Sequence, residues 1–415
     1  MTIPLTVIFW RALLALAAFG LVSSFVFLFL AIVAAIRFKK HADSIQRDAL
    51  SFPSDQLPSV TIFKPVHGME ERLEENLESF FQQDYPDFEI IIGARDADNP
   101  AVQVAEKICK RYPQVKSRIV VSGPPVWPNA KVFSLAKMIA AASYDYFVIS
   151  DSDVRVSRDF LRNVVPPLLD PALGLVTCLY QGVPAGDFWS LLEALGMSVE
   201  MPSGVVVADT LEGIRFALGP AVAVRKDVLD KIGGIAATAD YYSDDYVLGN
   251  KVWMAGYKVI FSHHVIEHVL TPRPLSRTLG DQLRWLKSTR YSRPLGHMGT
   301  GLTYAMPFGI LGLIASAALG QPAFGVLLFL VAVVNRVIQS IAVGRGLIGD
   351  RRALYFSFLY PIRDLVGWFL WVCSFTGGNF FWRGEMYRFT KGGKIVPRER
   401  AAENAKYTIK NARSG

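Results

Sequence analysis

Two aspartates separated by one residue follow an apolar run near the middle of the chain. The stretch 144–156 (YDYFVISDSDVRV) contains an apolar run that is typical of a buried parallel strand, and this run ends in Asp151-Ser152-Asp153. Ligands of open α/β sheets bind at the carboxyl ends of strands, so these carboxylates stand where a site is expected. Such oxygen ligands suit Mg²⁺ or Mn²⁺ that also binds substrate phosphates, as in a nucleotide-sugar diphosphate. The alternative is that both aspartates only cap a helix that follows near residue 157.

The strand before Asp151 belongs to a longer pattern. From residue 59 to about 270, apolar strands alternate with helical patterns, which is typical of an α/β fold with a mainly parallel sheet flanked by helices. Further strands are expected at 60–66, 88–93, 119–121, 173–179, 214–225 (a pair broken at Gly219-Pro220) and 257–263. Helices are expected at 70–82, 132–142, 188–201 and 245–254.

The N-terminal part contains a segment long enough to cross a bilayer. Residues 12–36 are 25 residues without a charge, and the basic residues Arg37, Lys39 and Lys40 follow them. A secretory signal would carry its positive charge before a shorter apolar core. The positive-inside rule therefore places the N-terminus outside and residue 37 onward in the cytoplasm.

The C-terminal part combines one basic helix with apolar segments. Residues 275–291 form a basic amphipathic pattern with a tryptophan, which is typical of a helix on a membrane surface. Residues 294–335 contain no Asp, Glu, Lys or Arg and divide into two spans at residues 320–322. The segment 354–376 carries Arg363 and Asp364, so it is either packed inside a bundle or re-entrant. The re-entrant form keeps the basic tail inside.

These patterns predict five regions along the chain. They are an N-terminal transmembrane anchor and linker (1–57), a cytoplasmic catalytic domain (58–272), an amphipathic interfacial helix (273–293), C-terminal membrane helices (294–385) and a basic cytoplasmic tail (386–415).

Composition limits the partners. The chain has 415 residues, of which 51% are hydrophobic, and this is too apolar for an ordinary soluble protein. Its net charge of +8 comes from basic residues beside apolar segments, which favours anionic lipid headgroups of a bilayer over nucleic acid. Three widely separated cysteines form no disulfide or zinc framework, as expected for a catalytic part in a reducing compartment.

Four features lie in one order along the chain, namely Asp96, Asp151-Ser152-Asp153, Ser243-Asp244-Asp245-Tyr246 and Arg284-Trp285. Together they resemble the D, DxD, D, (Q/R)xxRW series of membrane glycosyltransferases with the GT-A fold. The resemblance is greatest to the ceramide glucosyltransferase family and its bacterial relatives, including the glycosyltransferases of hopanoid lipid synthesis. It extends over residues 58 to about 395 and includes residues 95–100, 129–131, 150–156, 225–229, 382–384 and Tyr387.

The resemblance implies an activity and a location. The implied reaction moves a single sugar from a UDP-sugar to the hydroxyl of a membrane lipid, of ceramide or hopanoid type, with inversion. The implied protein is integral to the membrane, as in the bacterial inner membrane, with its catalytic domain facing the cytoplasm.

On the donor side, the resemblance implies roles for four residues and places Asn129 in the same cofactor-binding set. Asp96 would accept from the uracil or ribose, and Asp151 would lie by the ribose. Asp153, together with Asp151, would bind the metal, Mg²⁺ or Mn²⁺, that neutralises the diphosphate. Lys131, which follows Asn129 at a loop-to-helix junction, would contact the diphosphate of the UDP-sugar. The structural alternatives are a loop-capping aspartate for Asp96 and a solvated surface lysine for Lys131.

On the acceptor side, Asp245 would be the general base that takes the proton from the acceptor hydroxyl. Arg284 and Trp285 would close the site from the interfacial helix, with the arginine facing phosphates. Asp245 could instead complement a helix dipole, and Arg284-Trp285 could be a snorkelling arginine beside an interfacial tryptophan.

The sequence departs from the family pattern at two places. Asp281 stands three residues before Arg284, where the pattern has Gln or Arg. Met201-Pro202 matches a His-Pro pair of the animal ceramide glucosyltransferases, so we expect a different acceptor pocket. Three histidines, His263, His264 and His268, are candidates for an additional metal ligand, although strand-end histidines are more often plain surface or core.

Two other function classes remain open. A processive polysaccharide synthase of the cellulose or chitin type shares the aspartates and the Arg-Trp pair, but it needs a channel built from more spans. A non-catalytic lipid-binding membrane protein on the same fold would have no reason to keep the Asp-x-Asp triplet, Asp245 and Lys131.

Overall fold

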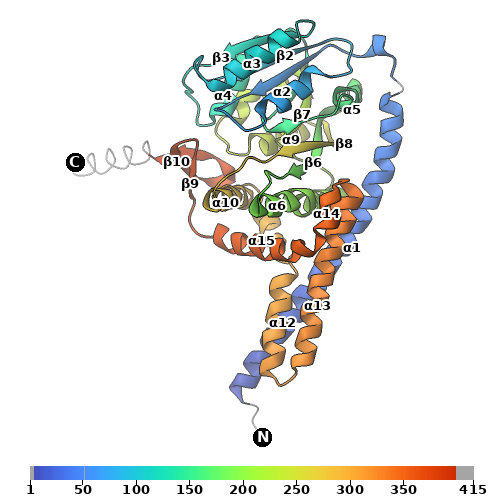
Figure 1. Cartoon of the computed structure of the whole chain (residues 1–415), viewed down its shortest axis with the longest axis vertical. Helices are drawn as coiled ribbons and strands as arrows, with labels where there is room; N and C mark the ends of the chain where they lie inside the picture. The colour runs from blue at the N-terminus through green and yellow to red at the C-terminus, as the bar shows by residue number, and fades with distance from the viewer. Residues whose placement is uncertain (1–3, 51, 399–415) are drawn as a thin grey trace, which may run out of the picture.

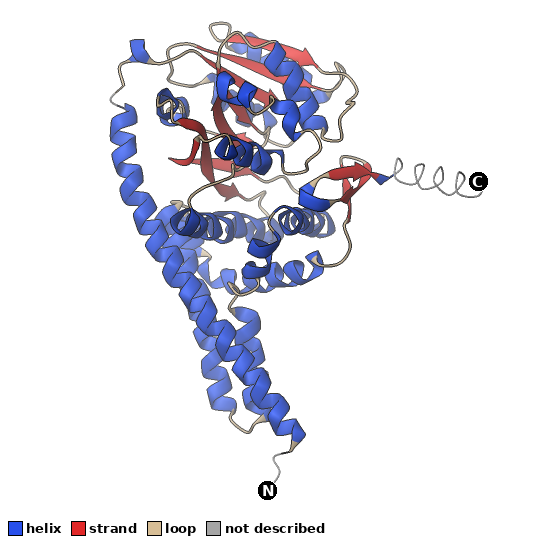
Figure 2. Ribbon diagram, turned by 180° about the vertical axis from the view of Figure 1, so that it is seen from behind, coloured by secondary structure: helices blue, strands red, loops and turns tan. Residues whose placement is uncertain are grey.

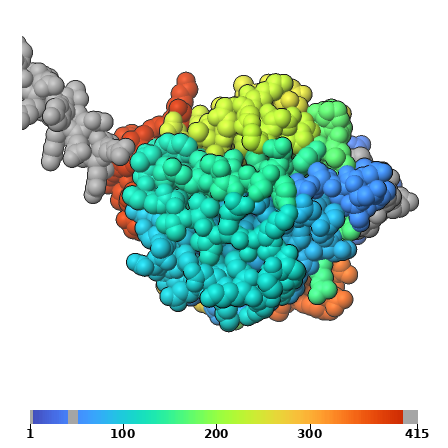
Figure 3. Space-filling view, turned by 90° about the horizontal axis from the view of Figure 1, so that it is seen from above, coloured from blue at the N-terminus to red at the C-terminus, as the bar shows by residue number. Residues whose placement is uncertain are grey.

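The computed structural model describes residues 4–50 and 52–398, with residues 41–50 described as backbone only. Most of the predicted basic tail, residues 399–415, lies outside this range. The molecule is elongated, with a sheet-containing part at one end and long helices at the end that holds the N-terminus (Figure 1). Seen from the sheet end, the sheet-containing part fills most of the view (Figure 3).

The main sheet has eight strands in the order β3-β2-β1-β4-β7-β6-β8-β5. Their bounds are β1 Val60–Pro65, β2 Phe88–Ala94, β3 Lys116–Val121, β4 Tyr146–Ser150, β5 Val154–Arg155, β6 Leu173–Val183, β7 Ala221–Arg225 and β8 Lys258–Val269. The strands from β3 to β4 run parallel, β7 is antiparallel to both β4 and β6, and β5 is antiparallel to β8. This mostly parallel sheet confirms the predicted α/β fold class.

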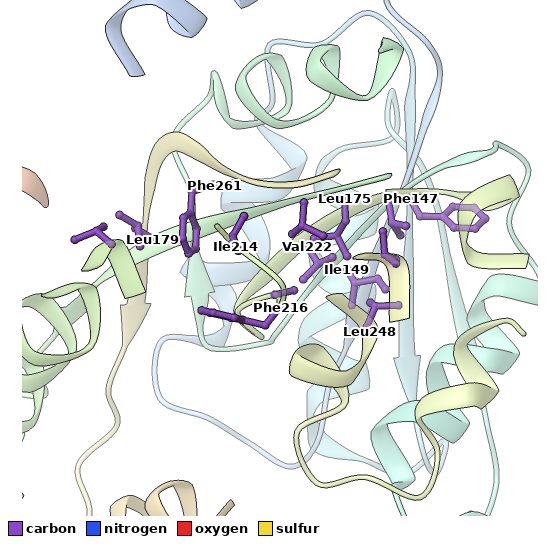
Figure 4. Packing of buried hydrophobic residues seen from close by; sticks show 14 of the residues in the cluster. Phe147, Ile149, Leu175, Leu179, Ile214, Phe216, Val222, Leu248 and Phe261 are labelled. Carbon is purple, nitrogen blue, oxygen red and sulfur yellow. The ribbon is translucent and has the colours of Figure 1, made fainter. Parts of the chain in front are cut away.

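The strands form where apolar residues are buried on both faces of the sheet. Phe63 of β1 and Phe147 of β4 pack edge to face with their ring centroids 5.2 Å apart. Ile149 and Val222 lie beside them in the same buried cluster (Figure 4). Because this packing fixes the pairing of β1 with β4, the ends of both strands meet at one edge of the sheet.

Helices cover the sheet, and three of them were not predicted from the sequence. The helices are α2 Leu73–Phe81, α3 Pro100–Arg111, α4 Ala130–Ala140, α5 Phe160–Val164, α8 Lys226–Lys231 and α9 Asp244–Met254. The unpredicted helices are α3, α5 and α8, and the N-terminus of α3 is capped by Asn99, which accepts from the N–H of Ala101.

The predicted strand pair at 214–225 is wrong in its first half. Only β7, Ala221–Arg225, is a strand, and residues 214–220 are irregular although Ile214 and Phe216 are buried. The segment lies so close to Gly249 of α9 that an added Cβ there would stand 2.2 Å from the nitrogen of Ala217. The N–H of Leu218 donates to the Thr177 hydroxyl at 2.9 Å, so a side chain replaces the missing strand partner.

A layer of helices crosses the molecule beneath the sheet (Figure 1). It contains α6 Phe188–Leu195, the π-helical stretch η3 Gly196–Glu200, α7 Met201–Glu212, α10 Leu275–Ser292, α14 Arg351–Tyr355 and α15 Tyr360–Ser374. The helix predicted at 188–201 therefore continues to Glu212. The leucine face of α10 is half-buried and the helix packs against α15, which lies between α10 and the pair α12 and α13.

Within the described residues, three helices are long and apolar enough to span a membrane, namely Leu5–Lys40, Phe188–Glu212 and Pro322–Leu347. The first is part of α1 (Leu5–Leu50), and the third joins α13 (Pro322–Gln339) to the π-helical η5 (Ser340–Leu347). Helix α1 runs beside α12 (Met306–Ala318) and α13, and then continues along the side of the sheet part (Figures 1 and 2). Phe188–Glu212 instead lies in the crossing layer, where two-thirds of its apolar window is buried.

The first predicted C-terminal span is divided into two shorter helices, α11 (Pro294–Thr300) and α12. The break coincides with the carboxylate of Asp364 on α15, which accepts from the N–H groups of Ala305 and Met306 at 3.0 and 2.8 Å. Asp364 therefore caps α12 from inside the protein. Arg363 and Asp364 are both buried, so the charges of the predicted third segment are packed among helices.

A second, three-stranded antiparallel sheet follows α15. It consists of β9 Asn379–Trp382, β10 Glu385–Phe389 and β11 Ile395–Pro397. A two-residue turn, Arg383-Gly384, joins the first two strands with φ of 50° and 87°. Positive φ at both positions is the geometry of the tight turn that such hairpins favour. This small sheet lies beside α10 (Figure 1), and the sequence did not indicate its strands.

Candidate active site

The Asp-x-Asp turn is fixed at the edge of the main sheet by its own backbone. The N–H of Asp151 donates to the carbonyl of Pro220 at 3.3 Å, and the N–H of Val269 donates to the carbonyl of Asp153 at 2.8 Å. No long helix follows, because β5 begins at Val154. The helix-capping alternative for Asp151 and Asp153 is therefore not what the structure contains.

Lys131 is a partner of Asp151, with its Nζ 2.6 Å from the Asp151 carboxylate and 3.8 Å from that of Asp244. Only 12% of its side chain is exposed, so it is not a solvated surface lysine. Burial opposes the charged form, yet the two carboxylates outweigh it and raise the pKa of Lys131. For the same reason Lys131 holds the pKa of Asp151 below its usual value, although burial opposes this shift.

Asn129 is fully buried, and its side chain hydrogen-bonds both to the backbone of Lys131 and to the carboxylate of Asp244. Its side-chain oxygen accepts from the N–H groups of Lys131 and Val132, which caps α4. Its amide donates to the carbonyl of Tyr241 at 2.8 Å and to the Asp244 carboxylate at 3.3 Å. The contacts of Asn129 therefore position Lys131 and Asp244.

Asp153 has one engaged and one unengaged carboxylate oxygen. Its Oδ2 lies 3.4 Å from Nε2 of His268, whereas Oδ1 is buried and has no hydrogen-bond partner within the described part of the chain. The described residues contain no group of three or more His, Cys, Asp or Glu side chains arranged around a common metal position. One unpartnered carboxylate oxygen fits Mg²⁺ or Mn²⁺ that takes its other ligands from water and substrate phosphates.

The other two candidate histidines have structural partners. His263 Nε2 lies 2.7 Å from the side-chain oxygen of Asn163. His264 contacts Ser157 and Asn163, and burial lowers its pKa to about 4. Among the three, His268 alone adjoins the Asp-x-Asp turn.

Lys64, at the end of β1, supports this turn from beneath and was missed by the sequence analysis. Its Nζ donates to the carbonyl of Asp151 and lies 3.3 Å from the hydroxyl of Ser150. Burial lowers its pKa to about 7, while the charges of Asp151 and Asp153 oppose the shift. The sequence did contain a signal for Lys64, namely a lysine within a strand that was expected to be buried. Buried lysines are rarely unpaired, so such a residue is expected to have a partner.

Glu70 is a second unpredicted neighbour. Burial, together with the charges of Asp153 and Asp151, raises its pKa to about 7, while a hydrogen bond to Ser152 opposes the shift. Its Oε2 is buried without a partner among the described residues. Glu70 lies in the loop between β1 and α2, and no sequence pattern predicts the conformation of that loop.

Asp245 lies in the first turn of α9, next to the segment that holds Asp151. A Cβ added to Gly219 would stand 2.9 Å from Oδ2 of Asp245, so this glycine makes room for the carboxylate. Burial and the charge of Asp244 raise the pKa of Asp245 to about 6, whereas Lys131 lowers it. An aspartate with this pKa is a competent general base near neutral pH.

Arg284 reaches from α10 toward the loop before α9. Its Nε donates to the Tyr242 hydroxyl at 2.7 Å, and its Nη1 donates to Asp281 at 2.7 Å. Asp281 also accepts from Arg273 at 2.9 Å. The residue that departs from the family pattern therefore orients Arg284.

Trp285 lies at helical spacing on the same face of α10 as Asp281 and Ser288, which are both buried. The Trp285 residue is nevertheless 38% exposed.

Two remaining charged residues differ in their relation to the Asp-x-Asp turn. Asp96 is exposed beyond β2, 3.8 Å from Arg95, and acts electrostatically on His67. Arg383, in the β9–β10 turn, interacts electrostatically with Asp151 and Asp244, and burial lowers its pKa. The Trp382-Arg383-Gly384 motif was a signal in the sequence, but only the hairpin turn brings its arginine to the aspartates.

Comparison with known proteins shows the family of this chain. The model of a family described as Glycosyl transferase family 21 matches residues 22–395. Ceramide glucosyltransferase 1 of Caenorhabditis elegans is 24% identical over 352 residues, covering 83% of this chain and 74% of the relative. Ceramide glucosyltransferase of Komagataella phaffii is 39% identical over 127 residues, which cover 30% of this chain and 25% of the relative.

Among solved structures, the chain is similar to the mannosyltransferase PcManGT from Pyrobaculum calidifontis in complex with GDP-Man and Mn²⁺. The TM-score is 0.50 at 19% identity, and the match covers 85% of this chain and 99% of that chain. This likeness concerns the fold.

Proposed function

Because this chain belongs to glycosyl transferase family 21, we propose that it transfers one sugar from a UDP-sugar to the hydroxyl of a membrane lipid, with inversion at the sugar. The observation that carries the proposal is the grouping of Asp151, Asp153, Lys131 and Asp245 at one edge of the sheet. Relatives that carry the name ceramide glucosyltransferase support a ceramide-like acceptor, and a hopanoid-type lipid is the other candidate.

The donor half of the proposed site is built for a diphosphate. Asp153, assisted by Asp151, would hold Mg²⁺ or Mn²⁺, which supplies positive charge to the departing UDP. Lys131 and Arg383 are cations beside the same aspartates and would bind the diphosphate oxygens directly. Asp96 is exposed at the end of β2, where it is free to accept from the uracil or ribose.

The acceptor half of the proposed site depends on Asp245. In a single displacement, the acceptor oxygen attacks the sugar carbon as the bond to UDP breaks, and the hydroxyl proton passes to Asp245. This attack from the opposite face inverts the anomeric centre. Arg284, held by Tyr242 and Asp281, and the exposed Trp285 would close the site from α10.

We also propose that the chain is integral to a membrane. Helices α1, α12 and α13 would lie in the bilayer, residues 58–272 would face the cytoplasm, and the bacterial inner membrane is the expected location. Transfer of a single sugar is favoured over processive synthesis, because a channel for a polysaccharide needs more spans than α1, α12 and α13 would supply. Helices α12 and α13 pack closely, since a Cβ added to Gly309 of α12 would stand 2.5 Å from Ala332 of α13.

The test uses the purified full chain in detergent with UDP-glucose, a short-chain ceramide and Mn²⁺. We expect a β-linked glucosylceramide by NMR, and we expect EDTA or Asp153→Asn to abolish its formation. Asp230→Asn, which changes an exposed aspartate on α8, is the matched control and should keep full activity. Full activity of Asp153→Asn in EDTA would contradict the metal role, and an α-linked product would contradict inversion.

A further inference from the structure

A small cavity lies where the long helices meet the crossing layer. Its volume is about 70 Å³, and α1, α7, α13, α15 and the loop before α12 enclose it. The polar side chains that line it include Glu200, Tyr304, Arg336, Gln339 and Asp364. It is separate from the Asp-x-Asp turn.

The charged groups at this cavity are paired with one another. Glu200 accepts from Arg363 at 2.8 and 3.1 Å, and Arg336 donates to Asp364 at 3.1 Å. Two cations thus balance two anions, and nothing in this set attracts a charged headgroup. A neutral polar group is the ligand that this arrangement favours.

One polar group at the cavity lacks a partner. Gln339 is 1% exposed, and its amide nitrogen donates to the Ser203 hydroxyl at 2.9 Å. Its Oε1 is buried and accepts no hydrogen bond from any described residue. Such an oxygen costs roughly 1–3 kcal/mol if left unsatisfied, so the site favours a ligand that donates a hydroxyl or an amide N–H.

One lining residue of the cavity is exposed, and charged side chains lie between the cavity and the neighbourhood of Asp153. Gly204 of α7 lines the cavity and is exposed, and an added Cβ there would meet no atom within 4 Å. On the inner side, Arg363 donates to Gln282 of α10 at 2.5 Å. Glu193 of α6 interacts electrostatically both with Arg363 and with His268, the neighbour of Asp153.

We propose that this cavity binds the uncharged, hydrogen-bond-donating head of the acceptor lipid, entering past Gly204 and donating to Gln339. The inference rests on the proposed function, since it assumes a lipid acceptor. It adds the place where the head of the proposed ceramide-like acceptor binds, a neutral amphiphile with hydroxyl or amide N–H donors and not an anionic phospholipid.

The test is photo-cross-linking of the full chain in phosphatidylcholine nanodiscs with a ceramide that carries a diazirine near its head. We expect labelled peptides from α7 and α13, at least tenfold less labelling in Gly204→Phe, and unchanged labelling in Gly204→Ala. Leu211→Phe is the matched control, because it adds bulk on the same helix at a residue that is 66% exposed. Unlabelled ceramide should compete, and phosphatidic acid should not.

A second variant covers the case in which Gly204→Phe does not fold. Gln339→Leu keeps a similar volume and removes the accepting oxygen, while Ser203 still donates to the carbonyl of Val199. We expect the ceramide concentration for half-maximal labelling to rise on the order of tenfold. The melting temperature of each variant verifies folding.

Three results would overturn the inference: equal labelling of Gly204→Phe and Leu211→Phe, labelling confined to other helices, or equal competition by phosphatidic acid and ceramide. Metal-dependent release of UDP from UDP-glucose is measured on the wild-type chain in the same nanodiscs. Its absence, with the expected labelling intact, would refute the proposed transferase function and still support the cavity as a site for a neutral lipid head.

Discussion

The side chain of Asp245 has a pKa raised to about 6 by burial and by the charge of Asp244. A general base must be ionised, so we expect turnover to be constant above about pH 7 and to fall as the pH drops through about 6. Asp245→Asn should lower turnover on the order of 10²–10⁴-fold and remove this acid limb. The measurement is the pH profile of kcat with Asp230→Asn as the control, and an unchanged acid limb in Asp245→Asn would reject Asp245 as the base.

At this scale the sequence predicted the residues that belong to linear motifs. Asp151, Asp153, Lys131 and Asp245 stand together because each follows a strand end or begins a helix at the same edge. Lys64, Glu70 and Arg383 were not predicted as site residues, because their approach to the aspartates depends on strand register, a loop and a hairpin turn. No local pattern encodes those distances.

Helix α10 packs against other parts of the protein on more than one side. Asp281 is buried and lies between Arg273 and Arg284, the leucines are half-buried, and the helix contacts α15. Amphipathicity predicted a helix over 275–291, and α10 runs from Leu275 to Ser292. The amphipathic pattern alone does not show which face of α10 packs against the rest of the protein, because ion pairs also allow a polar face to be buried.

This arrangement predicts the effect of Asp281→Asn. Loss of the carboxylate charge leaves Arg273 and Arg284 without their common partner, so Arg284 is held less firmly. We expect turnover to fall on the order of tenfold with a lower melting temperature, since breaking a partly buried pair costs about 2 kcal/mol after allowance for solvent screening. Arg277→Gln, at an exposed position on the same helix, is the control. Wild-type kinetics in Asp281→Asn would show that the pair only stabilises the helix.

Other elements show where tertiary contacts override local pattern. Residues 214–220 are apolar and were predicted as a strand, but Pro220 lacks an N–H and Thr177 takes the hydrogen bond that a neighbouring strand would make. The break between α11 and α12 is likewise invisible in an apolar run, because the residue that causes it, Asp364, lies some 60 positions away.

Across the whole molecule, α1, α13 and α15 are tied together by one buried group. Arg336 donates to Asp364 at 3.1 Å and to the hydroxyl of Ser24 at 2.8 Å. We expect Asp364→Ala to destabilise the protein by about 3–5 kcal/mol, because it leaves a buried arginine without its counter-ion. The measurement is the melting temperature in detergent.

The double variant Arg336→Met/Asp364→Asn provides the control for this prediction. It removes both charges, and the amide oxygen introduced at position 364 still accepts from the start of α12. We expect it to be more stable than Asp364→Ala. A double variant that is equally unstable would assign the loss to helix capping and not to the unpaired charge.

The position of Arg383 has a consequence for the order of events during synthesis. The arginine lies in the hairpin that follows α15, although it interacts electrostatically with Asp151, which is translated more than 200 residues earlier, and with Asp244. A nascent chain whose Asp-x-Asp turn has already left the ribosome therefore still lacks one of the cations beside that turn. The proposed donor site is completed only after α15 has been made, so we expect chains that end before Arg383 to lack one of its cations.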